Sequence, residues 1–417
     1  MQSHILIRRV EIILATVILF FVYLPGLGDI EFHPDESQWI SASHIFESYV
    51  RTEFNSEAWD QYYLNLHQPP VACYIIGIGR FIGGYRRPDL NPPWNFERGN
   101  KFNERVGAVP SDGLLWWSRL PMAILGILSI MLGFSILRKS STIAAYAWLG
   151  LVIFNPYFSL HLRRAMGESS LIFFTMLTLY LVTQALALAK EIGTNQKWNI
   201  TLCLLLAGIT SGLAGEAKLN GIVILGTNLV IAIILGFLLN EQFKEKITAV
   251  FRNGLSTSAM CLFAFIAINP FLWSAPFARS VQMFIDRAYG MNLQTNIYSG
   301  SYMDIGQRIP IILRRVFHDY ASLPIPAMFN FILVALGMWI TFMSLRGLLA
   351  RQDFKPGYVT FLIMAFFAAT PIWLSPLDWD RYYIYPVLFA TAFTAIAIDR
   401  IIHTSLHVGK RFFSRSA

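Results

Sequence analysis

Residues 8–36 decide the fold class and read RRVEIILATVILFFVYLPGLGDIEFHPDE. Two arginines precede an apolar run at 10–27, and a run of about 20 apolar residues is long enough to cross a bilayer. The pattern is that of a signal peptide without a small-residue cleavage site, so we expect an uncleaved first helix. Two adjacent carboxylates, Asp35 and Glu36, follow at once.

The rest of the chain has the same apolar character. Of its 417 residues, 55% are hydrophobic and 14% are charged, and the mean hydropathy is +0.49. Soluble domains carry about a quarter charged residues, so lipid is the expected solvent. The net charge of +8 comes from short basic clusters between apolar runs, which orient helices and do not predict a nucleic-acid partner. No metal-ligand spacing links the three cysteines, Cys73, Cys203 and Cys261.

Ten apolar runs predict an all-α polytopic membrane protein with about ten transmembrane helices. The expected spans are 10–27, 113–137, 141–160, 167–189, 198–214, 219–239, 255–274, 323–345, 357–375 and 383–402. With a cytoplasmic amino terminus, every cytoplasmic loop is basic, as the positive-inside rule requires. We therefore expect a multi-pass protein of the cell inner (plasma) membrane with both termini in the cytoplasm.

One further apolar run, 69–84, tests this topology. It is short, begins with Pro69 and Pro70 and contains Arg80. A crossing there would also place the later basic loops outside. We therefore expect it to lie at the interface or to dip partway in, together with an amphipathic juxtamembrane helix over 39–50.

The chain is expected to form a single membrane domain, because neither external loop is long or regular enough for a soluble domain. In the second loop, the polar stretch 289–302 predicts a solvated loop, with a mobile lid or acceptor platform as the alternative. The predicted parts are the domain 1–417, its core 1–225, the external loops 28–112 and 275–322, and the C-terminal helices 323–417.

Four polar clusters fall on the external face of this topology. Each has a simple structural explanation: a helix dipole, an anchoring ion pair, a snorkelling lysine or an aromatic belt. Their shared face suits a reaction on a lipid-borne phosphate, in which cations hold the phosphate and a carboxylate takes a proton from an incoming hydroxyl. The clusters are centred on Asp35 with Glu36, on Glu168, on Lys218, and on Arg381 with Tyr382.

These clusters resemble motifs of the C-superfamily (GT-C) of polytopic membrane glycosyltransferases, in the branch that includes protein O-mannosyltransferases and aminoarabinose transferases. The resemblance is strongest over 1–225. The lysine that usually follows the His-Pro-Pro segment is absent, since Val71 follows. This difference counts against protein O-mannosylation more than against the transferase class. The matching segments are 33–36 (HPDE), 67–70 (HQPP), 118–121 (SRLP), 164–168 (RAMGE) and, as an outlying match, 381–382 (RY).

The resemblance implies an inverting glycosyltransferase that moves a sugar from a polyprenyl-phosphate donor to an acceptor hydroxyl at the external face. Asp35 would be the catalytic base, supported by Glu36 and Glu168. Asp35 and Glu168 are also the candidates for holding a divalent Mg, Mn or Ca ion. The implied donor phosphate-binding residues are Arg119, Arg164, Lys218 and Arg381, and the candidate substrate-binding residues are His33, His67 and Tyr382.

Two other functions stay open at this point. A transporter or flippase of lipid-linked sugars would place ionisable groups near the bilayer midplane, in broken helices, whereas these polar groups gather at one face. A catalytically inactive scaffold with the same fold is the other alternative. The sequence specifies neither the sugar nor the acceptor, which could be a glycan, a lipid or a protein.

Overall fold

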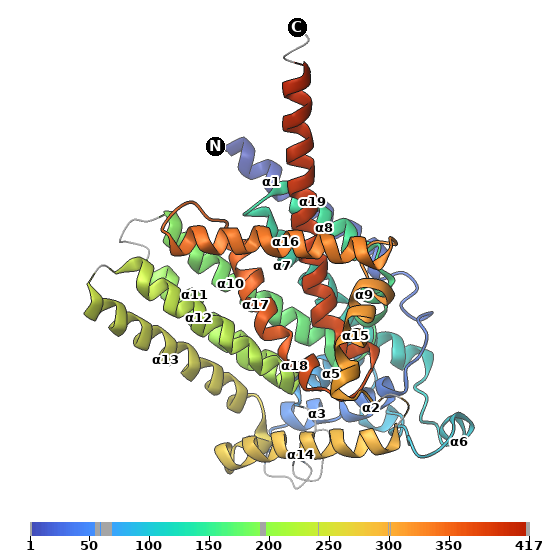
Figure 1. The fold of residues 1–417 in the computed structure, drawn as a ribbon. Coiled ribbons are helices and arrows are strands. Elements are labelled where there is room, and N and C mark those ends of the chain that lie inside the picture. The colour runs from blue at the N-terminus through green and yellow to red at the C-terminus, as the bar shows by residue number, and fades with distance from the viewer. Residues whose placement is uncertain are drawn as a thin grey trace.

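Long apolar helices form the body of the protein (Figure 1). The structure is a computed structural model, and it describes residues 2–54, 59, 69–191, 197–240, 242–298, 300 and 302–413. Eight helices in these ranges are long and apolar enough to cross a membrane. They confirm the all-α membrane fold. They are α7 (Asp112–Arg138), α10 (Gly167–Glu191), α11 (Lys197–Ala217), η4 with α12 (Leu219–Ile224, Leu225–Leu239), α13 (Phe243–Ala267), α16 (Ala327–Leu349), α17 with α18 (Pro356–Ala368, Thr370–Leu374) and η8 with α19 (Asp380–Tyr383, Ile384–Phe413).

The other two expected spans correspond to shorter apolar helices. The first is α1 (Gln2–Tyr23), whose apolar part is Val10–Tyr23. The run at 141–160 is divided into α8 (Thr142–Ile153) and α9 (Pro156–His161). Pro156 cannot continue a helix because it lacks an N–H, and the Asn155 side chain caps the new start by accepting the Tyr157 N–H.

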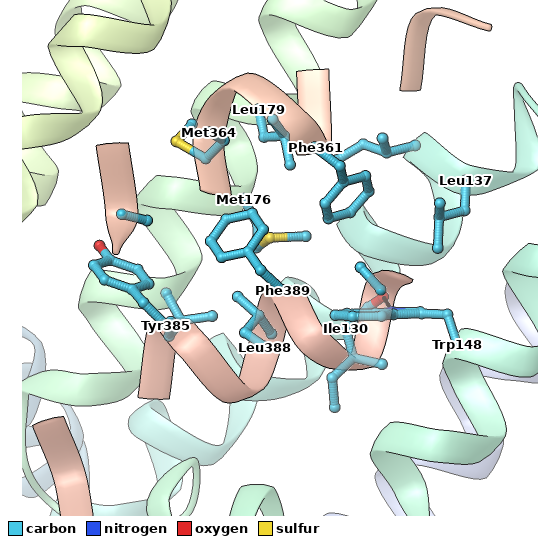
Figure 2. Close-up of a cluster of buried hydrophobic side chains, with 14 of the residues drawn as sticks. Ile130, Leu137, Trp148, Met176, Leu179, Phe361, Met364, Tyr385, Leu388 and Phe389 are labelled. Carbon is cyan, nitrogen blue, oxygen red and sulfur yellow. Dashed lines mark hydrogen bonds between the residues drawn. The ribbon is translucent and has the colours of Figure 1, made fainter. Parts of the chain in front are cut away.

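The largest buried cluster lies where α7, α8, α10, α17 and α19 meet, and Figure 2 shows its centre. In lipid, helices associate through close packing and interhelical hydrogen bonds. Gly133 illustrates the packing, since a Cβ there would come within 2.7 Å of the Trp148 indole. The Thr175 and Tyr385 hydroxyls form a hydrogen bond at 2.7 Å. This hydrogen bond joins α10 to α19, the two helices that carry site residues at or just before their starts.

The segment 28–112, which we predicted as an external loop, contains short helices: α2 (Pro34–Ala42), α3 (Ile45–Val50), α5 (Val71–Ile82), η2 (Arg87–Asp89) and α6 (Asn100–Arg105). The 12 residues of α5 reach about 18 Å, less than the roughly 30 Å of a hydrocarbon core. As expected from 69–84, this helix is too short to cross. The fully buried Arg80 attaches it to α3, with Nη2 donating to Glu47 Oε2 at 2.6 Å.

The prediction of one continuous juxtamembrane helix over 39–50 is wrong in one respect, because the chain forms two helices there, α2 and α3. Arg80 donates to both the hydroxyl and the carbonyl of Ser43. These bonds draw the Ser43 carbonyl away from a continuous helical ladder, so α2 ends beside it.

The segment 275–322, predicted as the second such loop, contains α14 (Pro276–Ile297), α15 (Ile305–Arg314) and η7 (Arg315–Asp319), and η5 (Pro270–Leu272) precedes it. Much of the stretch 289–302 is therefore helix, and the expectation of a solvated loop there is wrong. The helical signal lay upstream, since apolar side chains exposed on one face recur at helical spacing: Phe277, Val281, Phe284, Ile285, Tyr289, Leu293 and Ile297.

Both chain ends lie at one end of the bundle. Figure 1 shows the start of α1 and the end of α19 together, with α2, α3 and α14 at the opposite end. This is the arrangement that an even number of crossings produces. The polar clusters singled out in the sequence belong to the end that carries α2 and α14.

Candidate active site

A cavity of about 600 Å³ opens among elements that are far apart in the sequence. Its wall combines the first turn of α2, the start of α10, the turn before η4, the C-terminal half of α14 and the segment before α19. The lining residues are His33, Pro34, Asp35, Gln38, Trp39, Phe96, Met166, Glu168, Lys218, Arg287, Gln294, Ile297, Tyr298, Arg315, Tyr320, Asp378, Trp379, Asp380, Arg381 and Tyr382.

Asp35 faces this cavity from the first turn of α2. His33 caps the helix, with its Nδ1 accepting the Asp35 N–H at 3.1 Å, and Pro34 supplies a favourable first residue. The Asp35 Oδ2 lies 2.5 Å from Arg381 Nη1, and the two side chains keep 18% and 14% of their surface exposed. Arg381 also lies over the Trp379 ring, 4.5 Å from its centroid. Asp35 is therefore positioned and charge-balanced while remaining open to a ligand.

A second ion pair lies on the cavity wall. Glu168, in the first turn of α10, accepts a hydrogen bond from Lys218 Nζ at 2.7 Å. Lys218 directly follows α11 and also lies over the Tyr382 ring, 5.6 Å from its centroid. Carboxylates are favoured at a helix N-terminus by the helix dipole. Asp35 and Glu168 thus lie on the wall of one cavity, each next to its own cation.

Glu36 does not line the cavity, although it follows Asp35 in the sequence. It is fully buried and accepts two bonds from Arg119, at 2.8 Å from Nε and 2.7 Å from Nη2. It also accepts the backbone N–H groups of Ala165 and His33. We predicted that Glu36 supports the reaction directly, and its burial corrects this prediction. Glu36 is a structural carboxylate that joins α2 to α7 and to the turn before α10.

The two arginines expected at the donor phosphate, Arg119 and Arg164, also lie outside the cavity. Arg119 has no exposed surface and spends its remaining donors on the carbonyls of Leu27, Ile30 and Glu31. Arg164 is buried and donates to the Glu31 carbonyl at 3.3 Å. Because neither guanidinium lines the cavity and both are buried, the prediction that they bind the donor phosphate is corrected.

The three candidate substrate-binding residues have different outcomes. His33 and Tyr382 line the cavity, whereas His67 lies outside the described residues. Burial lowers the pKa of His33, although the neighbouring Asp35 carboxylate opposes this shift. A neutral ring keeps Nδ1 available as the acceptor that caps α2.

Sequence reasoning missed several polar groups in the cavity. Arg287 of α14 donates from Nη2 to the Tyr382 hydroxyl at 3.1 Å. Arg315 makes two bonds to Asp378, at 3.0 Å from Nε and 2.6 Å from Nη2, and the bonded Asp378 carboxylate raises the pKa of Arg315 above its usual value. The amphipathic spacing of α14 would have revealed Arg287 on its polar face. Nothing in the spacing of Arg315 predicts its partner.

A second, apolar cavity of about 350 Å³ adjoins the first. Lys218, Arg287 and Tyr382 line both cavities and therefore mark their boundary. Beyond them the second cavity is mostly hydrophobic, with Leu219, Ile222, Val223, Phe284 and Met291. The combined space can hold an amphiphile whose polar group sits at the two cations.

The carboxylates of the cavity do not make a metal site. Across the described ranges, no group of three or more His, Cys, Asp or Glu side chains could hold an ion. Asp35 and Glu168, the pair considered as ligands, are each occupied by a cation of the protein. These side chains therefore do not fit a resident metal ion.

Comparison with known sequences gives one family match. Residues 39–283, more than half of the chain, match the family described as dolichyl-phosphate-mannose-protein mannosyltransferase. No curated protein matches the chain in sequence.

Solved structures share the fold at low sequence identity. ArnT from Cupriavidus metallidurans, bound to undecaprenyl phosphate, matches 93% of this chain with a TM-score of 0.55 and 16% identity. The Archaeoglobus fulgidus oligosaccharyltransferase, in complex with Zn and sulfate, matches 95% with a TM-score of 0.50 and 13% identity. The Saccharomyces cerevisiae protein O-mannosyltransferase Pmt1-Pmt2 complex, bound to the sugar donor, matches 62% with a TM-score of 0.48 and 17% identity. This chain spans 60%, 49% and 33% of their respective lengths.

Proposed function

This chain belongs to the dolichyl-phosphate-mannose-protein mannosyltransferase family, and from that premise we propose that it transfers a sugar from a polyprenyl-phosphate donor to an acceptor hydroxyl. The observation that carries the proposal is the pairing of Asp35 with Arg381 and of Glu168 with Lys218 on the wall of one cavity. Transfer from a lipid phosphate needs both kinds of group, a base for the acceptor and cations for the leaving phosphate.

Before substrate binds, each carboxylate and its cation neutralise one another. A donor phosphate entering the cavity competes for Arg381 and Lys218, because charge-assisted bonds to phosphate resemble those to carboxylate. Drawing Arg381 toward the phosphate leaves Asp35 free to accept a proton. The ion pair thus links donor binding to the readiness of the base.

In the transfer step, Asp35 accepts the proton of the acceptor hydroxyl as that oxygen bonds to the anomeric carbon of the sugar. The bond from this carbon to the phosphate oxygen breaks, and polyprenyl phosphate leaves. A single displacement of this kind inverts the anomeric configuration. Arg381 and Lys218 stabilise the charge that develops on the phosphate, and Glu168 keeps Lys218 in place.

The adjoining apolar cavity supports a lipid-linked donor. Arg287 and Lys218 stand at its junction with the polar cavity, so a phosphate there would have its isoprenoid chain among apolar side chains and its sugar near Asp35. ArnT, which has a similar fold, was solved with undecaprenyl phosphate bound. Polyprenyl-phosphate sugars are therefore the first donors to test.

We place the reaction at the external face of the membrane. The short turns at the opposite end of the bundle are basic, with Arg138, Lys139, Lys190 and Lys355 among their residues, and short basic turns stay on the cytoplasmic side. Both chain ends would then be cytoplasmic, in agreement with their common position (Figure 1).

Asp35→Asn tests the proposal in purified protein supplied with polyprenyl-phosphate sugar. Removing a general base is expected to lower the transfer rate by about 10²–10⁴-fold, while the folded yield and unfolding temperature stay unchanged. Asp29→Asn is the matched control, since Asp29 is an exposed carboxylate of the same loop outside the cavity. Full activity in Asp35→Asn, or equal losses in both variants, would sink the mechanism.

A further inference from the structure

The structure contains a larger cavity, of about 950 Å³, at the other end of the bundle. Its walls come from α16, the loop before α17 and the C-terminal half of α19. Asp399, one of its lining residues, lies about 22 Å along α19 from the first residue, Ile384. Because the candidate active site lies at the start of α19, this cavity is a separate place in the molecule.

The carboxylates of this cavity are already satisfied by the protein. Asp399 is almost fully buried, with Oδ1 accepting from the Ser141 hydroxyl at 2.6 Å and Oδ2 from the Tyr358 hydroxyl at 3.0 Å. Asp353 pairs with Lys190 at 2.5 Å. Neither acidic group therefore needs a further cation.

The cations have capacity left. Lys355 lies 3.8 Å from Asp399, beyond hydrogen-bond distance, and His403 is half-exposed beside the same carboxylate. Within the described part of the chain, Arg400 has no ion-pair partner, and it lines the cavity as an exposed side chain. A guanidinium in this state can give two parallel hydrogen bonds to a phosphate.

The opposite wall is apolar. It is formed by the side of α16 that carries Ile340 and Met343 together with Trp339, whose side chain is 59% exposed. A free anion would gain nothing from this surface, whereas an acyl chain would lie along it. Under the proposed topology the cavity also faces the cytoplasmic leaflet, where anionic lipids are found.

We propose that this cavity binds the headgroup of an anionic phospholipid, with the phosphate at Arg400 and Lys355 and an acyl chain along α16. The site is independent of the transfer reaction, since it shares no residue with the cavity of Asp35. A bound lipid would hold α16 against α19, two helices that contact each other directly.

Native mass spectrometry of the purified full chain, offered equimolar phosphatidylglycerol and phosphatidylcholine, tests this proposal. We expect preferential retention of phosphatidylglycerol. Arg400→Gln should weaken that retention about five-fold, which corresponds to about 1 kcal/mol for one basic side chain near a lipid surface. Arg400→Lys should keep most of it, and the control Lys246→Gln, in α13 outside the cavity, should change nothing.

Two further measurements separate the sources of the anion. Trp339→Gln should release the lipid without changing any charge, which provides a test even if Arg400→Gln folds poorly. Excess inorganic phosphate should not displace the lipid. Equal retention of the two phospholipids, equal losses in Arg400→Gln and Lys246→Gln, an unaffected Trp339→Gln, or full displacement by inorganic phosphate would each overturn the proposal.

Discussion

The neighbouring carboxylates Asp35 and Glu36 each pair with an arginine, but one pair is partly exposed and the other is fully buried. Asp35 meets Arg381 at the wall of a cavity, with both side chains partly exposed. Glu36 meets Arg119 with no exposed surface on either side chain and two backbone N–H groups as additional donors. Successive residues of a helix point about 100° apart, so the first turn of α2 directs one carboxylate to a ligand and the other into the protein.

The comparison teaches that charge and sequence position do not distinguish a reactive group from a structural one. The two arginines differ in how many of their N–H groups are already hydrogen-bonded within the protein. Every N–H of Arg119 is used within the protein, whereas Arg381 has its carboxylate partner and aromatic faces beside open space. We therefore propose that Arg119 is a positioning residue and that Arg381 binds the ligand.

The largest effect should come from removing the buried cation. Arg119→Met leaves Glu36 charged and without a cation in a dry site, and breaking such a pair costs about 3–5 kcal/mol of stability. The same substitution at Arg381 should cost clearly less, because water in the cavity can solvate Asp35. Thermal unfolding of both variants in one detergent measures the difference. Equal losses of stability would break the distinction between the two pairs.

A smaller effect on activity should separate the charge of Arg381 from its shape. Arg381→Met should lower kcat/KM for the donor by about 10–100-fold, as expected for a hydrogen bond to a charged group worth about 1.5–3 kcal/mol. Arg381→Lys keeps the charge but loses the two-pronged geometry, so it should recover only part of that loss. The transfer assay at varied donor concentration provides the measurement. Complete recovery by lysine would show that geometry plays no part.

The smallest predicted effect is a pH dependence of the free energy of unfolding, which arises from His33 at the start of α2. Because burial lowers the pKa of His33 below its usual value of about 6.5, the folded state favours the neutral ring. Stability is then complete above about pH 6.5 and falls as the pH drops through the lowered pKa. We expect a loss below about 1 kcal/mol, the typical value of an N-cap.

His33→Asn provides the control for this prediction. Asparagine caps a helix without titrating, so the difference between unfolding temperatures at pH 7 and pH 5 should shrink in this variant. An unchanged difference would assign the pH dependence to other groups.

Much of the fold could be predicted from the sequence because bilayer thickness imposes a length on every span. The basic turns then fixed which polar clusters share a face, and Glu168 and Lys218 do meet. The breaks at Ser43 and Asn155 escaped prediction, since they depend on a distant Arg80 and on local capping.

The site could be predicted only in outline. Hydropathy and spacing placed Asp35, Glu168, Lys218 and Arg381 on one face, but they contain no information on which carboxylate turns inward. The contact between Arg315 and Asp378 depends on how η7 folds back toward the segment before α19. Such pairings are tertiary, and no local pattern of residue types records them.

The contact between Asp35 and Arg381 joins the start of α2 to η8, which leads into α19. During biosynthesis these segments leave the ribosome far apart in time, so the cavity stays incomplete until η8 and α19 have been inserted. A nascent chain halted before η8 would present Asp35 without its cation. The proposed activity therefore requires the insertion of α19, and chains halted before it should be inert.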